Sequence, residues 1–272
     1  MEQQFKKLYS SIRKIGAMQL PLYGANAAFF LTLSVFPGLL LILSALPYTG
    51  FSAVDLISAL EGILPRALMG SAERLIVNAY YNSSGALVSV SALAALWSAA
   101  RGIQGLMRGL NRVCGVRETR SWLHTRLICA GYVFVFLILL LVTLGFHVFG
   151  NRIILLLESA QTPISSRISQ LIDLRLILLM GAQILLFGLM YTVLPSRKSH
   201  FLTNLPGAAL AALGWQIFSQ LFSLYVSCNI AYTNIYGSVY LMALGMLWLY
   251  CCMQILLFGA GLNRLPIWKE KG

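Results

Sequence analysis

Charged side chains are scarce in this sequence. Only 10% of its 272 residues are Asp, Glu, Lys or Arg, against about 25% in an average soluble domain, and 58% are hydrophobic. A chain of this composition cannot cover an apolar interior with polar surface, which excludes a soluble globular protein. Its length suits a single membrane domain over residues 1–272, with little room for an appended soluble domain.

The sequence also lacks the residue clusters on which most enzyme mechanisms depend. The His and Cys residues show no metal-binding spacing, no Asp or Glu falls inside an apolar run, and neither a P-loop nor a GxGxxG motif occurs. Hydrolytic metal chemistry needs clustered carboxylates or imidazoles, and nucleotide-driven reactions need a phosphate-binding loop. We therefore expect a protein that is not an enzyme and that holds no metal or cofactor.

Long apolar runs dominate the chain instead, and they predict its fold. A run of roughly 20 apolar residues crosses the hydrocarbon core of a membrane as a helix, and the second run of this chain is only just long enough. Amphipathic segments over 53–64, 68–79 and 164–172 lie between them and have the spacing of surface helices. The sequence therefore predicts an all-α, polytopic membrane protein with six transmembrane helices and with amphipathic helices in its external loops. The predicted spans are 24–46, 84–100, 127–149, 176–194, 205–226 and 238–262.

The positive charge lies on one side of these spans. With a cytoplasmic N-terminus, the inner segments hold 15 of the 20 Lys and Arg and 3 of the 8 acids, whereas the outer segments hold 5 of each. The whole excess of +12 is thus internal, as the positive-inside rule expects. This distribution predicts six spans with both termini in the cytoplasm. It also accounts for the basic composition without nucleic acid, which we do not expect as a partner.

A dense group of arginines follows the second span directly. Residues 101–126 contain six Arg and one Glu, and on a continuing helix Arg101, Arg108 and Arg112 share one side, with Gln104 on its flank. Such arginines contact anionic lipid headgroups at the cytoplasmic face. Alternatively, they form an inner gate or a site for an anionic substrate, because the Arg fork binds phosphate and carboxylate with two donors.

A second candidate feature is an uncharged polar row in the fifth span. Gln216, Gln220, Ser223 and Ser227 recur at helical spacing, and a polar row facing lipid is costly, so it faces another helix or water. Interhelical hydrogen bonding and a solute path both explain it. In the first span, Pro37–Gly38 either kinks the helix or breaks it, and breaks within a membrane helix often accompany binding sites.

Several stretches resemble the YihY/BrkB family of bacterial inner-membrane proteins. They run in the same order over roughly residues 10–265: YGANAAFFLTLSVFPGLLL, LWSAARGIQGLMRGLNRV followed by ETRSW, YTVLP, LPGAALAALGW, and IYGSVYLMALGMLWLY followed by LLFGAGLN. Members once carried a ribonuclease BN label, since regarded as mistaken. The resemblance implies a six-span protein for which transport or export is the usual suggestion. Where the family typically has Gly-Ala-Glu, this chain has Gly259-Ala260-Gly261 and so lacks that acid.

Two functions remain open at this point. The first is a transporter or exporter of an anionic or amphiphilic substrate, with the Gln/Ser row and Pro37–Gly38 on its path. The second is a non-enzymatic structural or regulatory membrane protein that binds anionic lipid or a partner protein. A homo-oligomer is compatible with both.

Overall fold

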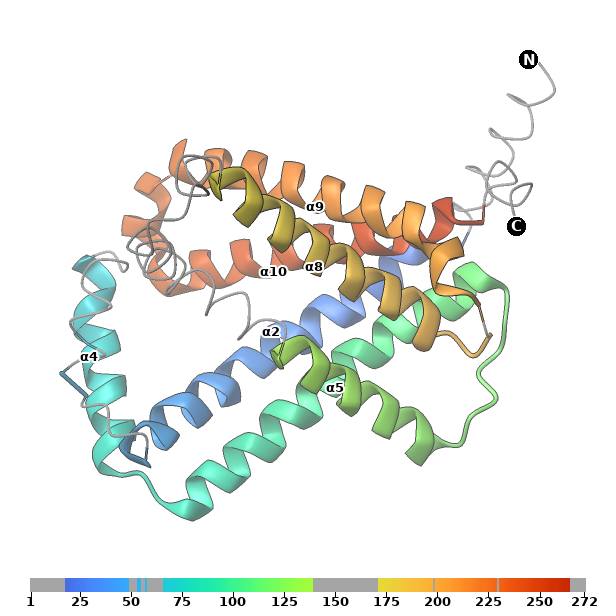
Figure 1. Ribbon diagram of the computed structural model, residues 1–272. Helices are drawn as coiled ribbons and strands as arrows, with labels where there is room; N and C mark the ends of the chain where they lie inside the picture. Colours follow the sequence, from blue (N-terminus) through green and yellow to red (C-terminus); the bar gives the residue numbers. More distant parts are fainter. Residues whose placement is uncertain are drawn as a thin grey trace, which may run out of the picture. The chain divides into compact units, whose positions relative to one another are not determined.

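The computed structural model describes residues 18–48, 53–54, 57, 66–138, 171–197, 199–228 and 230–264. Within these ranges every regular element is a helix, which confirms the all-α prediction for them (Figure 1). In chain order the labelled elements are α2 (Leu20–Ala45), the short 3-10 helix η1 (Leu46–Tyr48), α4 (Arg66–Tyr81), α5 (Gly85–Cys114), α8 (Leu171–Val193), α9 (Phe201–Cys228) and α10 (Ile230–Leu262).

Four of these helices are long and apolar enough to cross a membrane in the part of the chain that the structure describes. They are Leu20–Ala45, Gly85–Cys114, Phe201–Cys228 and, within α10, Met242–Leu262. Two shorter apolar helices, Trp122–Ile138 and Met180–Val193, fall within or overlap the third and fourth predicted spans. The length and composition of these helices are those of a membrane protein, and each of the six apolar runs coincides at least in part with a described helix.

The helices extend beyond the apolar runs at two points. As expected for the helix that carries the arginine row, α5 continues past residue 100 to Cys114, and Gly102, Gly105 and the apolar residues between the arginines pack as part of it. Helix α9 begins at Phe201, before the fifth apolar run, so Pro206 stands inside the helix. Pro37 does not break α2, which is helical on both sides of it.

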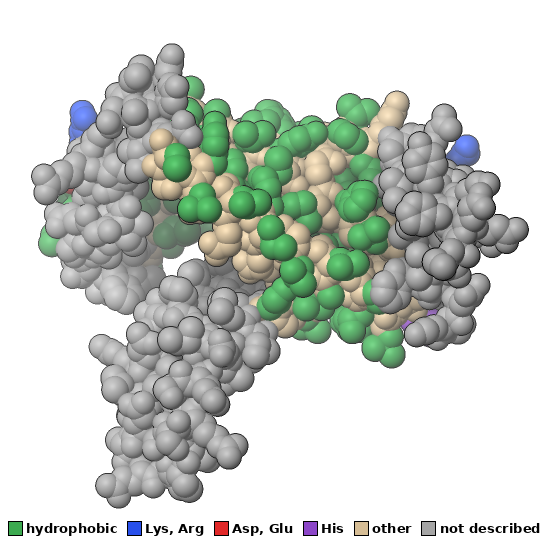
Figure 2. Space-filling model, turned by 90° about the horizontal axis from the view of Figure 1, so that it is seen from above, with side chains coloured by type: hydrophobic (Ala, Val, Ile, Leu, Met, Phe, Trp, Pro, Cys, Tyr) green, Lys and Arg blue, Asp and Glu red, His purple; other side chains and the backbone are tan. Residues whose placement is uncertain are grey.

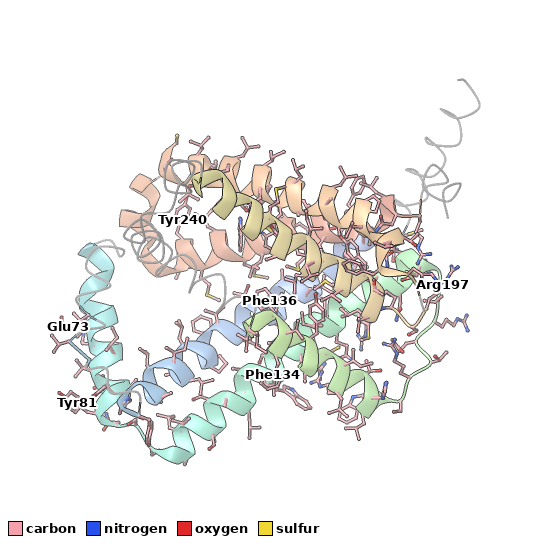
Figure 3. All side chains as sticks on the ribbon, in the orientation of Figure 1. Glu73, Tyr81, Phe134, Phe136, Arg197 and Tyr240 are labelled. Atoms are coloured by element: carbon pink, nitrogen blue, oxygen red, sulfur yellow. The ribbon has the colours of Figure 1, made fainter. Side chains whose placement is uncertain are left out.

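The second amphipathic segment is confirmed as α4, whose residues Ile76 and Ala79 are buried while Glu73 and Arg74 are exposed. Figure 3 shows Glu73 and Tyr81 projecting from this helix. The segments predicted over 53–64 and 164–172 lie largely outside the described residues.

The chain divides into two compact units, and α5, α9 and α10 each contribute a segment to both. The first contains Met107–Gln216 and Ile255–Gly272, with Met1–Leu20, and the second contains Pro21–Leu106 and Ile217–Gln254. In the first unit, buried tyrosines connect the helices by hydrogen bonds to backbone. The Tyr132 hydroxyl donates to the Leu186 carbonyl at 2.6 Å, and the Tyr191 hydroxyl donates to the Leu256 carbonyl at 2.6 Å.

In the second unit, α2 and α5 approach closely through small residues. Ala27 and Ala28 are fully buried, and a Cβ on Gly102 would stand 2.7 Å from Leu31 Cγ and 3.1 Å from the Ala27 carbonyl oxygen. A Cβ on Gly105 would stand 2.7 Å from Asn26 Oδ1. Small residues permit such backbone contact between membrane helices. The contact fixes the register of the two helices, so that residues 102–105 of α5 lie beside residues 26–31 of α2.

Helix α10 contains a sharp change of direction at Gly237, where φ is 58° and ψ is −135°. Only glycine adopts this conformation without strain, because it has no Cβ. The helical segment before Gly237 is therefore distinct from the long segment after it. The candidate membrane span of α10, Met242–Leu262, lies within this long segment.

Apolar side chains are abundant on the described surface, and Figure 2 shows them spread over the face that it presents. They include Phe134 and Phe136, which are 53% and 44% exposed on helix Trp122–Ile138 (Figure 3). So many large exposed apolar residues are expected where lipid, rather than water, surrounds the protein.

Candidate functional site

The predicted arginine row lies on the exposed side of α5. Arg101, Arg108 and Arg112 are all exposed, and Gln104 is half-buried on their flank. The opposite side of the same helix is buried and apolar, and consists of Ala100, Ile103, Leu106, Met107, Leu110 and Val113. The helix therefore presents its guanidinium groups outward. Arg101 lies in the second unit, where its guanidinium carbon stands 5.6 Å from the centre of the Phe30 ring.

The polar row of α9 is also exposed. Gln216, Gln220, Ser223 and Ser227 all lie on the surface of the described structure. In the first unit, Gln216 Nε2 donates a hydrogen bond to Gln183 Oε1 of α8 at 3.3 Å. In the second unit, the Ser227 hydroxyl donates to the Leu224 carbonyl of its own helix at 2.8 Å. Gln216 and Ser227 of the row are thus bonded to protein.

Pro37 and Gly38 are both half-buried in α2. Among the described residues, and apart from chain neighbours and the helix's own backbone, no atom lies within 4 Å of the position that a Cβ on Gly38 would occupy. The contacts described in the second unit do not bring these two residues together with the polar row of α9. A shared cavity between the first and fifth spans therefore stays a prediction.

Sequence reasoning did not find a polar cluster that forms just beyond the end of α5. The helix ends in a Schellman motif, with Gly115 at φ 67°, Gly115 N donating to the Arg112 carbonyl, and Val116 N donating to the Asn111 carbonyl. This turn sends the chain back toward Asn111. The Glu118 carboxylate then accepts hydrogen bonds from Asn111 Nδ2 at 2.9 Å and from Ser196 Oγ at 2.7 Å.

Arg120 completes this cluster by capping the end of α8. Its guanidinium donates to the carbonyl oxygens of Leu194 at 3.1 Å and Pro195 at 2.9 Å, with a longer contact of 3.5 Å to Val193. The last carbonyls of a helix have no partner within it and carry the negative end of its dipole, so a cation there is stabilising. We call Asn111, Glu118, Arg120 and Ser196 the polar tie, because it joins the loop after α5 to the turn after α8.

The charge on Glu118 is stabilised by these contacts. Partial burial alone would raise the pKa of its carboxyl group. Hydrogen bonds from Ser196, the Arg120 N–H and Asn111, together with the nearby Arg120 charge, outweigh that effect and leave the pKa below its ordinary value of 4.5. The tie is therefore formed with an ionised carboxylate at neutral pH.

Replacing Glu118 with Gln is expected to lower the free energy of unfolding by about 1 kcal/mol at pH 7, a value reduced for the exposure of this carboxylate. Because the pKa is lower in the folded state, the stabilisation is present above the ordinary pKa and is lost as the pH falls through the folded value. The midpoint of thermal unfolding in detergent should be lower for the variant than for the wild type, by a gap that is full at pH 7 and closes below about pH 4. The exposed Glu73, replaced in the same way, serves as the control. A gap of unchanged size at pH 3 would contradict this account.

A second buried polar group joins α9 to the end of α10. Asn263 Oδ1 accepts a hydrogen bond from Gly207 N at 2.7 Å, and Asn263 Nδ2 donates to the Asn204 carbonyl at 3.0 Å. Asn204 in turn donates to Ser199 Oγ and Thr192 Oγ1. These residues lie at the same end of α8, α9 and α10, and they fix the geometry of the helices near the polar tie.

A signal for both groups was present in the sequence. Asn111, Glu118, Arg120, Ser196, Asn204 and Asn263 all stand between apolar runs or next to their ends. Only the fold shows that they bond to each other, because their partners lie far away in the sequence. Among the described residues, no group of three or more His, Cys, Asp or Glu could hold a metal ion.

Comparison with known proteins gives a match to the family described as virulence factor BrkB, over residues 11–267. The chain belongs to the BrkB family. A relative of the BrkB chain is the putative ribonuclease-like protein YfkH of Bacillus subtilis, which is 31% identical over 247 residues, covering 91% of this chain and 90% of that protein.

Shorter matches to other relatives support the membrane assignment of the BrkB chain. A UPF0761 membrane protein of Alteromonas mediterranea is 35% identical over 80 residues, covering 29% of this chain and 27% of that one. Another, from Idiomarina loihiensis, is 38% identical over 77 residues, covering 28% and 27%. No solved structure matches the chain. The protein is thus a membrane protein of the BrkB family.

Proposed function

We propose that this BrkB-family protein is an inner-membrane transporter or exporter of an anionic or amphiphilic substrate. The observation that carries the proposal is the exposed row of Gln216, Gln220, Ser223 and Ser227 on α9, a helix otherwise apolar enough to span the bilayer. Polar amides are costly against lipid tails, so they mark a surface that meets water, a polar solute or another helix.

The chemistry of this surface and of α5 suits an anion. The row contains no acid that would attract a cation, and the exposed side of α5 carries arginines at the end that we assign to the cytoplasm. A lipid-like or other amphiphilic anion combines the two features, because its charge pairs with arginine and its apolar part tolerates the bilayer.

The proposed topology has six spans with both termini in the cytoplasm. It rests on the charge distribution of the sequence, and it places residues 117 and 269 inside and residues 61 and 165 outside. Single cysteines introduced at these positions in a cysteine-free background should react with an impermeant maleimide on intact spheroplasts only at 61 and 165. Labelling at 117 before the membrane is opened would overturn the charge argument.

The experiment that tests transport uses the purified protein in sealed vesicles. A fluorescent phosphatidylglycerol analogue is placed in one leaflet, and its movement to the other is followed by chemical quenching from outside. We expect movement that increases with the amount of protein and that is absent from protein-free vesicles. Equal rates in the two preparations would refute transport of this class of substrate.

A structural or regulatory role is the second candidate. The observation that favours it is the exposure of Arg101, Arg108 and Arg112 on the surface of α5. Exposed arginines can contact anionic headgroups without any movement of solute. This alternative gains support if the vesicles that contain the protein show no protein-dependent transfer.

We also propose that the protein is not a ribonuclease, although its relative YfkH is described as ribonuclease-like. Support comes from the absence of a metal-ligand group among the described residues and of an acid inside any predicted span. Nucleic acid is accordingly not proposed as a partner.

A further inference from the structure

Arg101 lies deeper along the helices than its place in the sequence indicated. The glycine contacts of α5 with α2 set Gly102 beside Leu31 and Ala27, and the Arg101 guanidinium lies over the ring of Phe30. Phe30 follows Gly24, the predicted start of the first span, by six residues, which is roughly 9 Å along a helix axis. An exposed guanidinium therefore stands beside α2 at a depth where lipid tails, rather than water, are expected.

The two helices offer this charge an aromatic ring and no counter-ion. Neither α2 nor α5 contains a single Asp or Glu. The ring of Phe30 attracts the guanidinium through its negative face, but a ring cannot neutralise a full charge. A charged group at membrane depth is costly and is normally paired, so the balancing anion must come from elsewhere.

The residues beside Arg101 indicate what kind of anion fits. On the same side of α5, toward its start, Trp97 is 52% exposed and Leu93 is 68% exposed. The exposed side of the helix thus changes from apolar to cationic between Trp97 and Arg101. A molecule seated here needs an anionic group at Arg101 and an apolar body along Trp97 and Leu93, which describes a phospholipid and not a free inorganic anion.

We propose that Arg101 binds the phosphate of an anionic phospholipid from the inner leaflet, with Phe30 holding the guanidinium in place and Trp97 and Leu93 contacting an acyl chain. The inference rests on the proposed function in one respect, since it takes the transported substrate to be a lipid that carries a phosphate. The guanidinium fork donates two hydrogen bonds to the phosphate, and the lipid supplies the missing counter-charge at membrane depth.

Binding is measured with the full-length protein in a neutral detergent by native mass spectrometry, with phosphatidylglycerol, phosphatidylcholine and inorganic phosphate as separate probes. Wild-type protein should retain phosphatidylglycerol in preference to phosphatidylcholine and should not bind inorganic phosphate. Arg101→Gln should weaken phosphatidylglycerol binding about tenfold, the loss expected for one charge-assisted pair of hydrogen bonds. Arg197→Gln, which alters an exposed arginine in the turn after α8 (Figure 3), should change it less than about twofold, because it removes the same charge but leaves Phe30, Trp97, Leu93 and Arg101 intact.

Two further variants separate a bound lipid from general charge attraction. Arg101→Lys keeps the charge but loses the fork, and Phe30→Leu keeps an apolar side chain but loses the ring, so both should weaken phosphatidylglycerol binding by a smaller factor than Arg101→Gln. Equal losses in Arg101→Gln and Arg197→Gln would overturn the proposal, as would equal binding of the two lipids or retention of inorganic phosphate. If Arg101→Gln loses the lipid and the vesicles show no transfer, the lipid site stands and the transport function fails.

Discussion

Replacing Gln216 and Gln220 together with Leu is expected to abolish transport by the protein while leaving it inserted in the membrane. The two Gln side chains are the largest members of the exposed polar row on α9, and Gln216 is held by Gln183 at 3.3 Å. Their replacement removes the amide donors and acceptors that a polar headgroup would meet. Insertion should be unaffected or improved, because Leu partitions into the bilayer more readily than Gln.

The measurement is transfer of the fluorescent phosphatidylglycerol analogue in vesicles with matched amounts of protein, and membrane insertion is checked by carbonate extraction. A paired exchange of apolar residues on the same helix, Ile217→Leu with Leu221→Ile, serves as the control. Both residues are exposed, at 54% and 60%, and the exchange leaves the polar row intact. Normal transfer by the Gln216→Leu, Gln220→Leu variant would show that the row is an interhelical contact and not part of a path.

Replacing Gly207 with Ala is expected to lower the free energy of unfolding more than the other stability variants proposed above. A Cβ on Gly207 would collide with the carbonyl oxygen of Gly259 and would stand 2.5 Å from Asn263 Cγ and Nδ2. Backbone and a doubly hydrogen-bonded side chain cannot move aside easily, and overpacking of this kind costs about 1–3 kcal/mol or more. The gain of roughly 1 kcal/mol from replacing a helical Gly by Ala offsets only part of this cost.

The effect is measured as the midpoint of thermal unfolding in detergent, followed by tryptophan fluorescence. Gly181→Ala on α8 is the matched control, because no atom other than its neighbours and its own helix backbone lies within 4 Å of the added Cβ. This control should be neutral or slightly stabilising, whereas Gly207→Ala should unfold at a clearly lower temperature. Similar midpoints for the two variants would mean that α9 and α10 pack less closely at Gly207 than the structure shows.

The position of the helices was predictable from the sequence for a simple reason. A membrane helix must satisfy its backbone internally and present apolar side chains outward, so α2, α9 and the long segment of α10 follow from uninterrupted apolar residues alone. The same reasoning does not give the contacts of each helix. Helix α5 continues past its apolar run to Cys114, and the structure sets Arg101 beside Phe30 of α2.

The polar tie was not predictable in the same way. Asn111 and Ser196 are 85 positions apart, and Asn263 bonds to Gly207 across 56 positions. Neither residue type nor spacing identifies such partners, because each residue alone resembles an ordinary polar residue at a helix end. The left-handed turn at Gly115 was similarly hidden, since many glycines in the chain occupy ordinary helical positions.

The sequence by itself determined that this is a membrane protein with long apolar helices, because hydrophobic length acts on each segment separately. Only the tertiary structure decided which polar groups meet, where Arg101 stands along α2, and which glycines cannot carry a side chain. Those features depend on the register between helices. Register is set by close contact between small residues that are distant in the chain, and no single segment specifies it.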